Sequence, residues 1–237
     1  MRQKLGNEAT INTQTLTGFE EGLYAWLAVR ENFRNDSNFG IVEMGGASTQ
    51  ITFPCADCED TQQILVRGES LPMYSYSFLG LGQDEAPKTL GLAPTCEYGV
   101  GLHDRDWTPA TCAKDIHFEY PEGFIDPYNY GPQGRGTYND VPNEQAKVEN
   151  WTLTGAFNYM APDDVDNCCM DENQCYQPET SCFRAVYLPK YLNALEIVSS
   201  QTVSASWTYG AAVCAATNCL QDRSGRHCRW TDKGCLE

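Results

Sequence analysis

Residues 39–53 read FGIVEMGGASTQITF and carry the clearest local pattern of the chain. An apolar run ends at Glu43, two adjacent glycines follow, and residues 50–53 return with the alternating polar and apolar side chains of a strand. Because adjacent glycines permit a tight turn between two such runs, this stretch predicts a β-hairpin with a glycine-rich tip.

The tip of this hairpin has the composition of an anion-binding turn. Consecutive backbone N–H groups from Gly45 onward can form a nest for a phosphate. Ser48 and Gln50 are two positions apart on one strand, so they face the same side, where both can hydrogen-bond a water molecule. Glu43, just before the tip, can reach a hydrated metal ion. An ordinary Gly-Gly hairpin is the plain alternative, but an acidic residue two positions before Gly-Gly-Ala-Ser-Thr-Gln is far more specific.

The segment before the hairpin, residues 15–33, reads TLTGFEEGLYAWLAVRENF and predicts a helix. Thr17 followed by Glu20 fits a capping box, and apolar side chains recur behind it at helical spacing. Glu21 then lies in the first turn, where the helix dipole favours an ionised carboxylate. Such a carboxylate, facing a phosphate-binding turn, can take a proton from an attacking water. First-turn acids are common, however, and the segment alone favours a solvated acid.

The pattern beyond the hairpin is uneven. Residues 74–81 predict another strand, residues 182–199 resume a helical pattern, and residues 206–217 indicate a strand or turn leading into a small-residue helix. The stretch 86–181 carries most of the prolines and several cysteines. We expect long loops pinned by disulfides there rather than regular structure.

Composition and charge exclude several classes of function. The chain has 237 residues, 41% of them hydrophobic, which is enough to bury a sizeable core. Sixteen basic and 32 acidic residues give a net charge of −16, which argues against a nucleic-acid reader and against binding to an anionic membrane. No apolar run approaches the roughly 18 residues of a membrane-spanning helix.

Twelve cysteines and two glycosylation acceptors, at Asn35 and Asn150, indicate a secreted or extracellular protein or one of the secretory lumen. The acidic neighbours of the pair Cys55 and Cys58 disfavour a reactive thiolate, so a structural disulfide is expected there. The first residues have no apolar core of a signal peptide, and we expect that a further segment precedes Met1.

The motifs together resemble those of a known enzyme family. LTGFEEGLYAWL resembles the third conserved region of the apyrases, the ecto-nucleoside triphosphate diphosphohydrolases, and EMGGASTQITF resembles their fourth. YSYSFLGLGQDEA is similar to the segment after it, and CFRAVYLPKYL and SASWTYGAAV are similar to the family's final helix and closing motif. The resemblance implies an α/β, RNase H-like lobe of the actin-like superfamily, with long disulfide-pinned loops.

The resemblance also implies roles for particular residues. Glu21 would be the general base, and Ser48 and Gln50 would position the attacking water. Glu43 would hold Ca²⁺ or Mg²⁺ through water, and Trp207 would lie near the cleft. The set implied to bind substrate consists of Gly45, Gly46 and Ala47 for the phosphate, with Gly82 and Gln83 in the nucleobase loop. The implied reaction is metal-dependent hydrolysis of nucleoside tri- and diphosphates by in-line attack of water.

This chain departs from the family pattern in three respects. Glu43 stands where the family usually has Asp, and Gln83 stands where a basic residue is common, which puts the metal geometry and the substrate contacts there in doubt. The first two conserved regions, which build the N-terminal lobe, are absent. We therefore expect residues 1–205 to form the second lobe, with a loop-rich insertion at about 86–181. The remaining segment, 206–237, would begin with residues 206–217, which close onto a first lobe supplied by another chain. A disulfide-stapled tail would follow.

Two other functions remain open from the sequence. The lobe can be an inactive apyrase-like module for extracellular binding or assembly, since the aromatic loop at 118–138 suits protein contacts or a higher assembly as well as a nucleobase. A related actin-like phosphatase acting on polyphosphate or guanosine polyphosphates is the third. Retention of Glu21, Ser48 and Gln50 together favours the enzyme, inactive as this chain alone.

Overall fold

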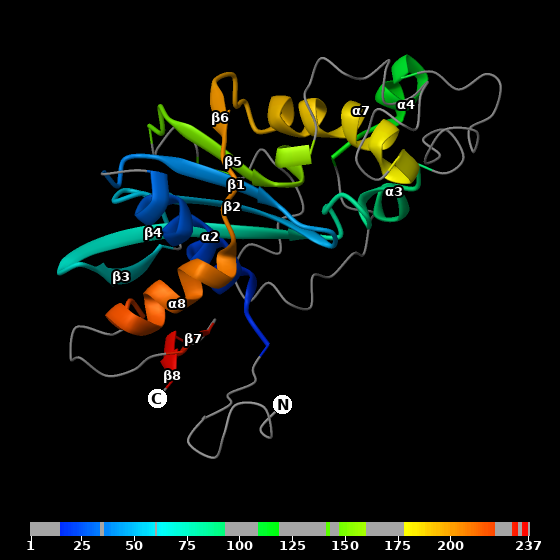
Figure 1. Cartoon of the computed structure of the whole chain (residues 1–237). Coiled ribbons are helices and arrows are strands. Elements are labelled where there is room, and N and C mark those ends of the chain that lie inside the picture. The colour runs from blue at the N-terminus through cyan, green and yellow to red at the C-terminus, as the bar shows by residue number, and fades with distance from the viewer. Residues whose placement is uncertain are drawn as a thin grey trace, which may run out of the picture.

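The computed structural model describes residues 15–33, 36–59, 61–92, 109–118, 141–142, 147–159, 178–220, 229–231 and 234–236. Within these, a six-stranded mixed sheet forms the centre, with strand order β3-β4-β2-β1-β5-β6 (Figure 1). The strands are β1 (Gly40–Met44), β2 (Ser48–Pro54), β3 (Gln62–Val66), β4 (Glu69–Leu79), β5 (Trp151–Gly155) and β6 (Ser200–Thr202). A small separate hairpin joins β7 (Arg229–Thr231) to β8 (Gly234–Leu236).

The sheet combines two modes of pairing. The pairs β3–β4, β4–β2 and β2–β1 are antiparallel, whereas β5 is parallel to β1 and β6 is parallel to β5. Four antiparallel strands extended by two parallel strands, with helices on both faces, confirm the expected α/β fold. The carboxyl end of β1 and the amino end of β2 meet at the hairpin tip, so that end of the sheet carries the predicted site.

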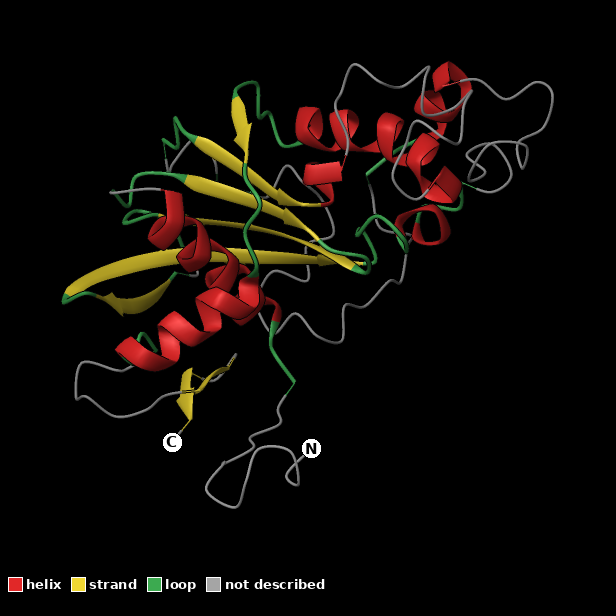
Figure 2. Ribbon diagram, in the orientation of Figure 1, coloured by secondary structure: helices red, strands yellow, loops and turns green. Residues whose placement is uncertain are grey.

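Long helices cover both faces of the sheet (Figure 2). Helices α2 (Gly18–Phe33) and α8 (Trp207–Thr217) pack against one another on one face. Helix α7 (Pro178–Ala194) lies on the other face. The shorter elements are α3 (Ala86–Thr89), α4 (Pro109–Asp115) and the 3₁₀ turn η2 (Ala156–Tyr159). We refer below to the α2 face and the α7 face of the sheet.

Each face has its own apolar core. On the α7 face, Val42, Ile51, Phe53 and Phe78 from the sheet join aromatic residues of α7 such as Tyr187. On the α2 face, the apolar residues of the helix meet Ile41, Ile64 and Met73. Successive residues of a strand point to opposite faces, which is why Ile41 and Val42 belong to different cores.

The hairpin and the first helix agree with their sequence predictions. β1 and β2 pair antiparallel with Glu43 opposite Gln50, and α2 begins immediately after Thr17. The strand expected at 74–81 is the second half of the longer β4. The helices expected at 182–199 and within 206–217 correspond to α7 and α8.

The expectation of irregular structure throughout 86–181 was wrong for several segments, since α3, α4, β5, η2 and the first residues of α7 fall within it. Residues 151–155, WTLTG, form β5 beside β1 in the middle of the sheet. Their alternation of apolar and threonine side chains is short, and its pairing depends on β1, more than a hundred residues away. The Tyr-rich loop lies outside the described residues, apart from Phe118, which packs against Tyr187 and Tyr191.

Two disulfides lie among the described residues. Cys55 pairs with Cys58 directly after β2, as the sequence predicted. Cys214 pairs with Cys219 at the end of α8, where the Cys219 carbonyl also accepts a hydrogen bond of 2.9 Å from the Leu65 N–H of β3. The end of α8 is thus fixed to the edge of the sheet.

Candidate active site

The first turn of α2 separates the roles of two adjacent glutamates. The Thr17 N–H donates to Glu20 Oε2 at 2.7 Å, and the Glu20 N–H donates back to Thr17 Oγ1 at 3.2 Å. This reciprocal pair is the predicted capping box, and it occupies the Glu20 carboxylate. Glu21, one position further round the helix, points to the sheet instead.

Glu21 meets both residues that were predicted to position water. Gln50 Nε2 donates to Glu21 Oε2 at 2.7 Å, and Ser48 Oγ lies 3.4 Å from the same oxygen. Gln50 Nε2 also lies 2.9 Å from Ser48 Oγ, so the two β2 side chains share one face as expected. The structure thereby brings together three side chains from a helix and a strand that are 27 and 29 residues apart.

The environment of Glu21 makes it a stronger base than an exposed glutamate. Burial raises the pKa of Glu21 above its usual value, while the hydrogen bond from Ser48 opposes part of that rise. A general base works best when its pKa approaches the working pH, so the direction of the shift suits proton abstraction.

The turn between β1 and β2 is held from one side by the loop after β4. The carbonyl of Gly45 accepts from the Gln83 N–H at 3.0 Å, that of Gly46 accepts from the Asp84 N–H at 2.8 Å, and that of Ala47 accepts from the Gly80 N–H at 2.8 Å. The Gly45 N–H closes the turn onto the Ser48 carbonyl at 2.9 Å. In the described part of the chain, the N–H groups of Gly46 and Ala47 have no backbone acceptor, which makes them the candidates for binding an anion.

Close approach, rather than an unusual backbone angle, explains Gly46 in this turn and Gly82 in the loop that packs on it. A Cβ on Gly82 would lie 2.4 Å from the Ser48 nitrogen and 2.5 Å from the Gly46 oxygen. A Cβ on Gly46 would lie 2.6 Å from Asp84 Oδ2. Gly82 is therefore required for packing the loop on the turn, and its contact with a nucleobase stays a prediction, as does that of Gln83.

Glu43 lies on the α2 face at the end of β1, 8% exposed and paired in register with Gln50. Burial, together with the negative charge of Glu21, raises the pKa of Glu43 to about 8. Its Oε2 atom is buried and has no hydrogen-bond partner in the described part of the chain. A buried acceptor of this kind fits a cation or a water held by a cation.

Metal ligands are otherwise sparse. Within the described residues, no group of three or more His, Cys, Asp or Glu side chains could hold an ion. Glu43 therefore fits a divalent ion that takes its remaining oxygens from water and phosphate, and the residues present do not specify Ca²⁺ or Mg²⁺.

Three residues of the site were not singled out in the sequence. Ser77 in β4 accepts from Gln50 Nε2 at 3.0 Å. Gly155 has a φ of +71°, and a Cβ there would lie 2.2 Å from the Met44 carbonyl oxygen and 3.0 Å from Glu43 Oε1. Asp84 lies beside Gly46, and burial raises its pKa. The sequence signals that could have indicated these residues are the strand pattern around Ser77 and the glycine that follows WTLT.

Of the remaining predicted residues, two are exposed and one lies outside the described residues. Trp207 begins α8 and is 36% exposed. α8 rests on α2 through Gly210, because a Cβ there would be 1.7 Å from the Tyr24 carbonyl oxygen. Asn150 is exposed just before β5, and Asn35 lies outside the described residues.

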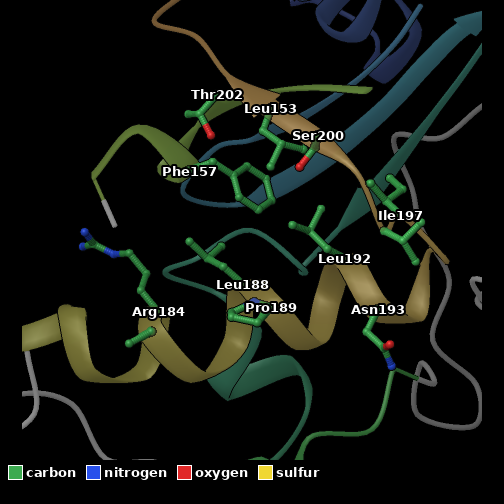
Figure 3. A pocket seen from close by; sticks show the side chains of 12 residues that line it. Leu153, Phe157, Arg184, Leu188, Pro189, Leu192, Asn193, Ile197, Ser200 and Thr202 are labelled. Carbon is green, nitrogen blue, oxygen red and sulfur yellow. The ribbon is translucent and has the colours of Figure 1, made fainter. Parts of the chain in front are cut away.

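A pocket of about 560 Å³ lies on the α7 face, between α7 and the strands β5 and β6 (Figure 3). Leu153, Leu188 and Leu192 give it an apolar wall. None of the predicted site residues lines it. The candidate active site is therefore the cluster on the α2 face.

Residues 6–212 match the GDA1/CD39 (nucleoside phosphatase) family. The chain belongs to this family. Mouse ectonucleoside triphosphate diphosphohydrolase 3 is 25% identical over 203 residues, which cover 75% of this chain and 36% of that protein. The probable apyrase 5 of Arabidopsis thaliana is 32% identical over 114 residues, covering 43% of this chain and 23% of that protein. The resemblance to the apyrases is thus confirmed.

One solved structure is also similar to part of this chain. The nucleoside triphosphate hydrolase of Neospora caninum is 28% identical over 37% of this chain and 21% of that chain, with a TM-score of 0.27. The GDA1/CD39 chain described here spans about a third of the length of the mouse relative it matches. In its described part, no helix is both long and apolar enough to cross a membrane.

Proposed function

We propose that this chain carries the water-activating half of an apyrase site, which hydrolyses nucleoside tri- and diphosphates. The observation that carries the proposal is the meeting of Glu21 with Gln50 at 2.7 Å and with Ser48 at 3.4 Å beside the Gly45–Ala47 turn. Family membership supports a nucleoside phosphatase, and this geometry suggests how the chain takes part in the reaction.

Each residue has a defined task in this mechanism. Glu21 Oε2 removes a proton from water, while Ser48 and Gln50 hold that water in line with the terminal phosphorus. The N–H groups of Gly46 and Ala47 bind the phosphate oxygens. Glu43 would hold a divalent cation through water. The bound cation would supply charge neutralisation and orientation of the phosphates.

The proposal includes a first lobe on another chain. Trp207 and Tyr209 are 36% and 44% exposed on α8, whereas Gly210 and Cys214 of the same helix are buried. This exposed aromatic pair suits a closing segment that packs on the first lobe, with Trp207 near the cleft. Nucleobase contacts from Gly82 and Gln83, secretion, and glycosylation at Asn35 and Asn150 belong to the same proposal.

The test is phosphate release from ATP and from ADP by the natively isolated protein, with Mg²⁺ or Ca²⁺ and again with EDTA. We expect release from both substrates and its loss in EDTA. Glu21→Gln should lower turnover by about 10²- to 10⁴-fold with the fold intact. Glu20→Gln is the matched control, because a glutamine retains the capping box, and it should keep near-normal turnover.

Two results would contradict the proposal. Near-normal turnover of the Glu21→Gln variant would remove the assignment of the base. Absence of release with either metal in the natively isolated protein would favour the inactive binding module instead.

A further inference from the structure

Gln50 has a buried partner on the neighbouring strand. In the β2–β4 register Gln50 lies directly opposite Ser77, and Gln50 Nε2 donates to Ser77 Oγ at 3.0 Å. The two residues are 0% and 6% exposed. A directly opposite pair in a sheet has little freedom to separate, so Ser77 is fixed relative to Gln50 by the backbone itself.

The contacts of the Gln50 amide define its orientation. Nε2 lies within 3.0 Å of three acceptors, namely Glu21 Oε2, Ser48 Oγ and Ser77 Oγ. Oε1 is buried and has no partner in the part of the chain that is described. The reversed amide would place Oε1 against the Glu21 carboxylate, where two acceptors face one another. The contacts of Nε2 with these three oxygens therefore fix which end of the Gln50 amide faces the base.

The same serine lies under the turn of α2 that carries the base. A Cβ on Gly18 would lie 2.3 Å from Ser77 Cβ, so the helix rests on β4 at this point. One step further along the sheet the arrangement is repeated, because Thr52 and Ser75 are opposite one another with their hydroxyl oxygens 2.7 Å apart. Gly22 of α2 packs on that second pair.

We propose that Ser77 is a positioning residue that orients the Gln50 amide, so that Nε2 stays beside Glu21 and Ser48, where the attacking water is held. The proposal rests on the proposed hydrolysis and deepens it. Ser77 does not touch substrate. It acts by retaining Nε2 on the side of Glu21, which fixes the direction of the water's lone pair toward phosphorus.

The experiment compares Ser77→Ala with Ser75→Ala, which changes the equivalent hydroxyl one step further along the sheet, away from Gln50. Both variants are assayed in the assembly in which wild-type phosphate release is measured. We expect Ser77→Ala to lower kcat about tenfold with KM unchanged. Ser75→Ala should leave kcat near wild type, because its hydroxyl bonds to Thr52.

A second measurement reads the orientation without any turnover. The side-chain amide of Gln50 gives an NMR signal, identified by its loss in Gln50→Glu. Its two hydrogens should shift and exchange faster with solvent in Ser77→Ala but not in Ser75→Ala. Equal kcat in the two variants, or an unchanged Gln50 signal in Ser77→Ala, would overturn the proposal.

The two readouts separate this proposal from the proposed function. A wild-type protein without phosphate release would overturn the hydrolysis and the catalytic task of Ser77 with it. The NMR comparison would still decide whether Ser77 orients Gln50.

Discussion

The two faces of strand β2 bury different kinds of side chain. Ile51 and Phe53 point to the α7 face and pack among aromatic residues. Gln50 and Thr52 point to the α2 face and meet serines of β4 through hydrogen bonds. All four side chains are fully buried. Burial alone therefore does not distinguish the structural face from the chemical one.

The difference lies in how closely the covering helix approaches. On the α2 face, Gly18 and Gly22 bring the helix backbone onto the side chains of Ser77, Ser75 and Thr52. Apolar packing depends on summed contact area and tolerates small adjustments, whereas hydrogen bonds depend on distance and angle. The α2 face thus has less apolar contact than the α7 face at this strand, but it fixes the distance between Glu21 and Gln50.

The largest effect on stability should come from the α7 face. Ile51→Ala removes a fully buried side chain and should lower the free energy of unfolding by about 2–5 kcal/mol. Turnover per folded molecule should change little. Gln50→Ala, one residue away on the opposite face, is the matched variant, and there we expect the loss in turnover. Both variants should be measured by denaturant unfolding and by phosphate release. A loss of turnover in Ile51→Ala together with a loss of stability in Gln50→Ala would contradict this assignment of the two faces.

A smaller effect should appear at Glu43, with a dependence on pH. Its pKa is about 8 in the fold, above an ordinary value of 4.5. Between these values the unfolded chain releases the proton while the folded chain retains it, so stability falls as pH rises from 4.5 to 8. Glu43→Gln removes this slope and should stabilise the protein by roughly 2–4 kcal/mol at pH 7 in EDTA.

Thermal unfolding of wild type and Glu43→Gln across this pH range, with and without Mg²⁺, measures the effect. Addition of Mg²⁺ should stabilise the wild type and not the variant. Parallel pH profiles of the two proteins in EDTA would show that Glu43 is ionised in the fold.

The smallest effect concerns the support of the loop from the α7 face. Tyr187 Oη donates to the Leu81 carbonyl at 2.7 Å, within the loop whose N–H groups hold the Gly45–Ala47 turn. Tyr187→Phe keeps the ring and should cost about 0.5–1.5 kcal/mol in the free energy of unfolding. Chemical denaturation measures this cost. A much larger loss would mean that the hydroxyl, rather than the ring, holds α7 to the sheet.

Local patterns predicted the parts of the site that are close in sequence. The capping box at Thr17 and Glu20, the hairpin tip and the shared side of Ser48 and Gln50 each depend on residues within a few positions. Those interactions follow from helix and strand periodicity, so sequence alone was sufficient. The family resemblance added the role of Glu21, which its own segment left undecided.

The partners of these residues could not be predicted in the same way. Ser77 meets Gln50 only through the register of β2 with β4, and Gly155 meets Glu43 only because β5 inserts beside β1. Gly210 is needed because α8 crosses the backbone of α2 at Tyr24. Strand pairing over a hundred residues and helix contact at a single glycine leave no periodic signal in the chain.

The sequence by itself determined the hairpin, the capped helix and the chemical types of the candidate catalytic residues, because each depends on short-range geometry. The tertiary structure alone decided how far Glu21 lies from Gln50 and which buried partner orients that amide. Those properties depend on distances between distant segments, which are fixed only when the helix packs on the sheet.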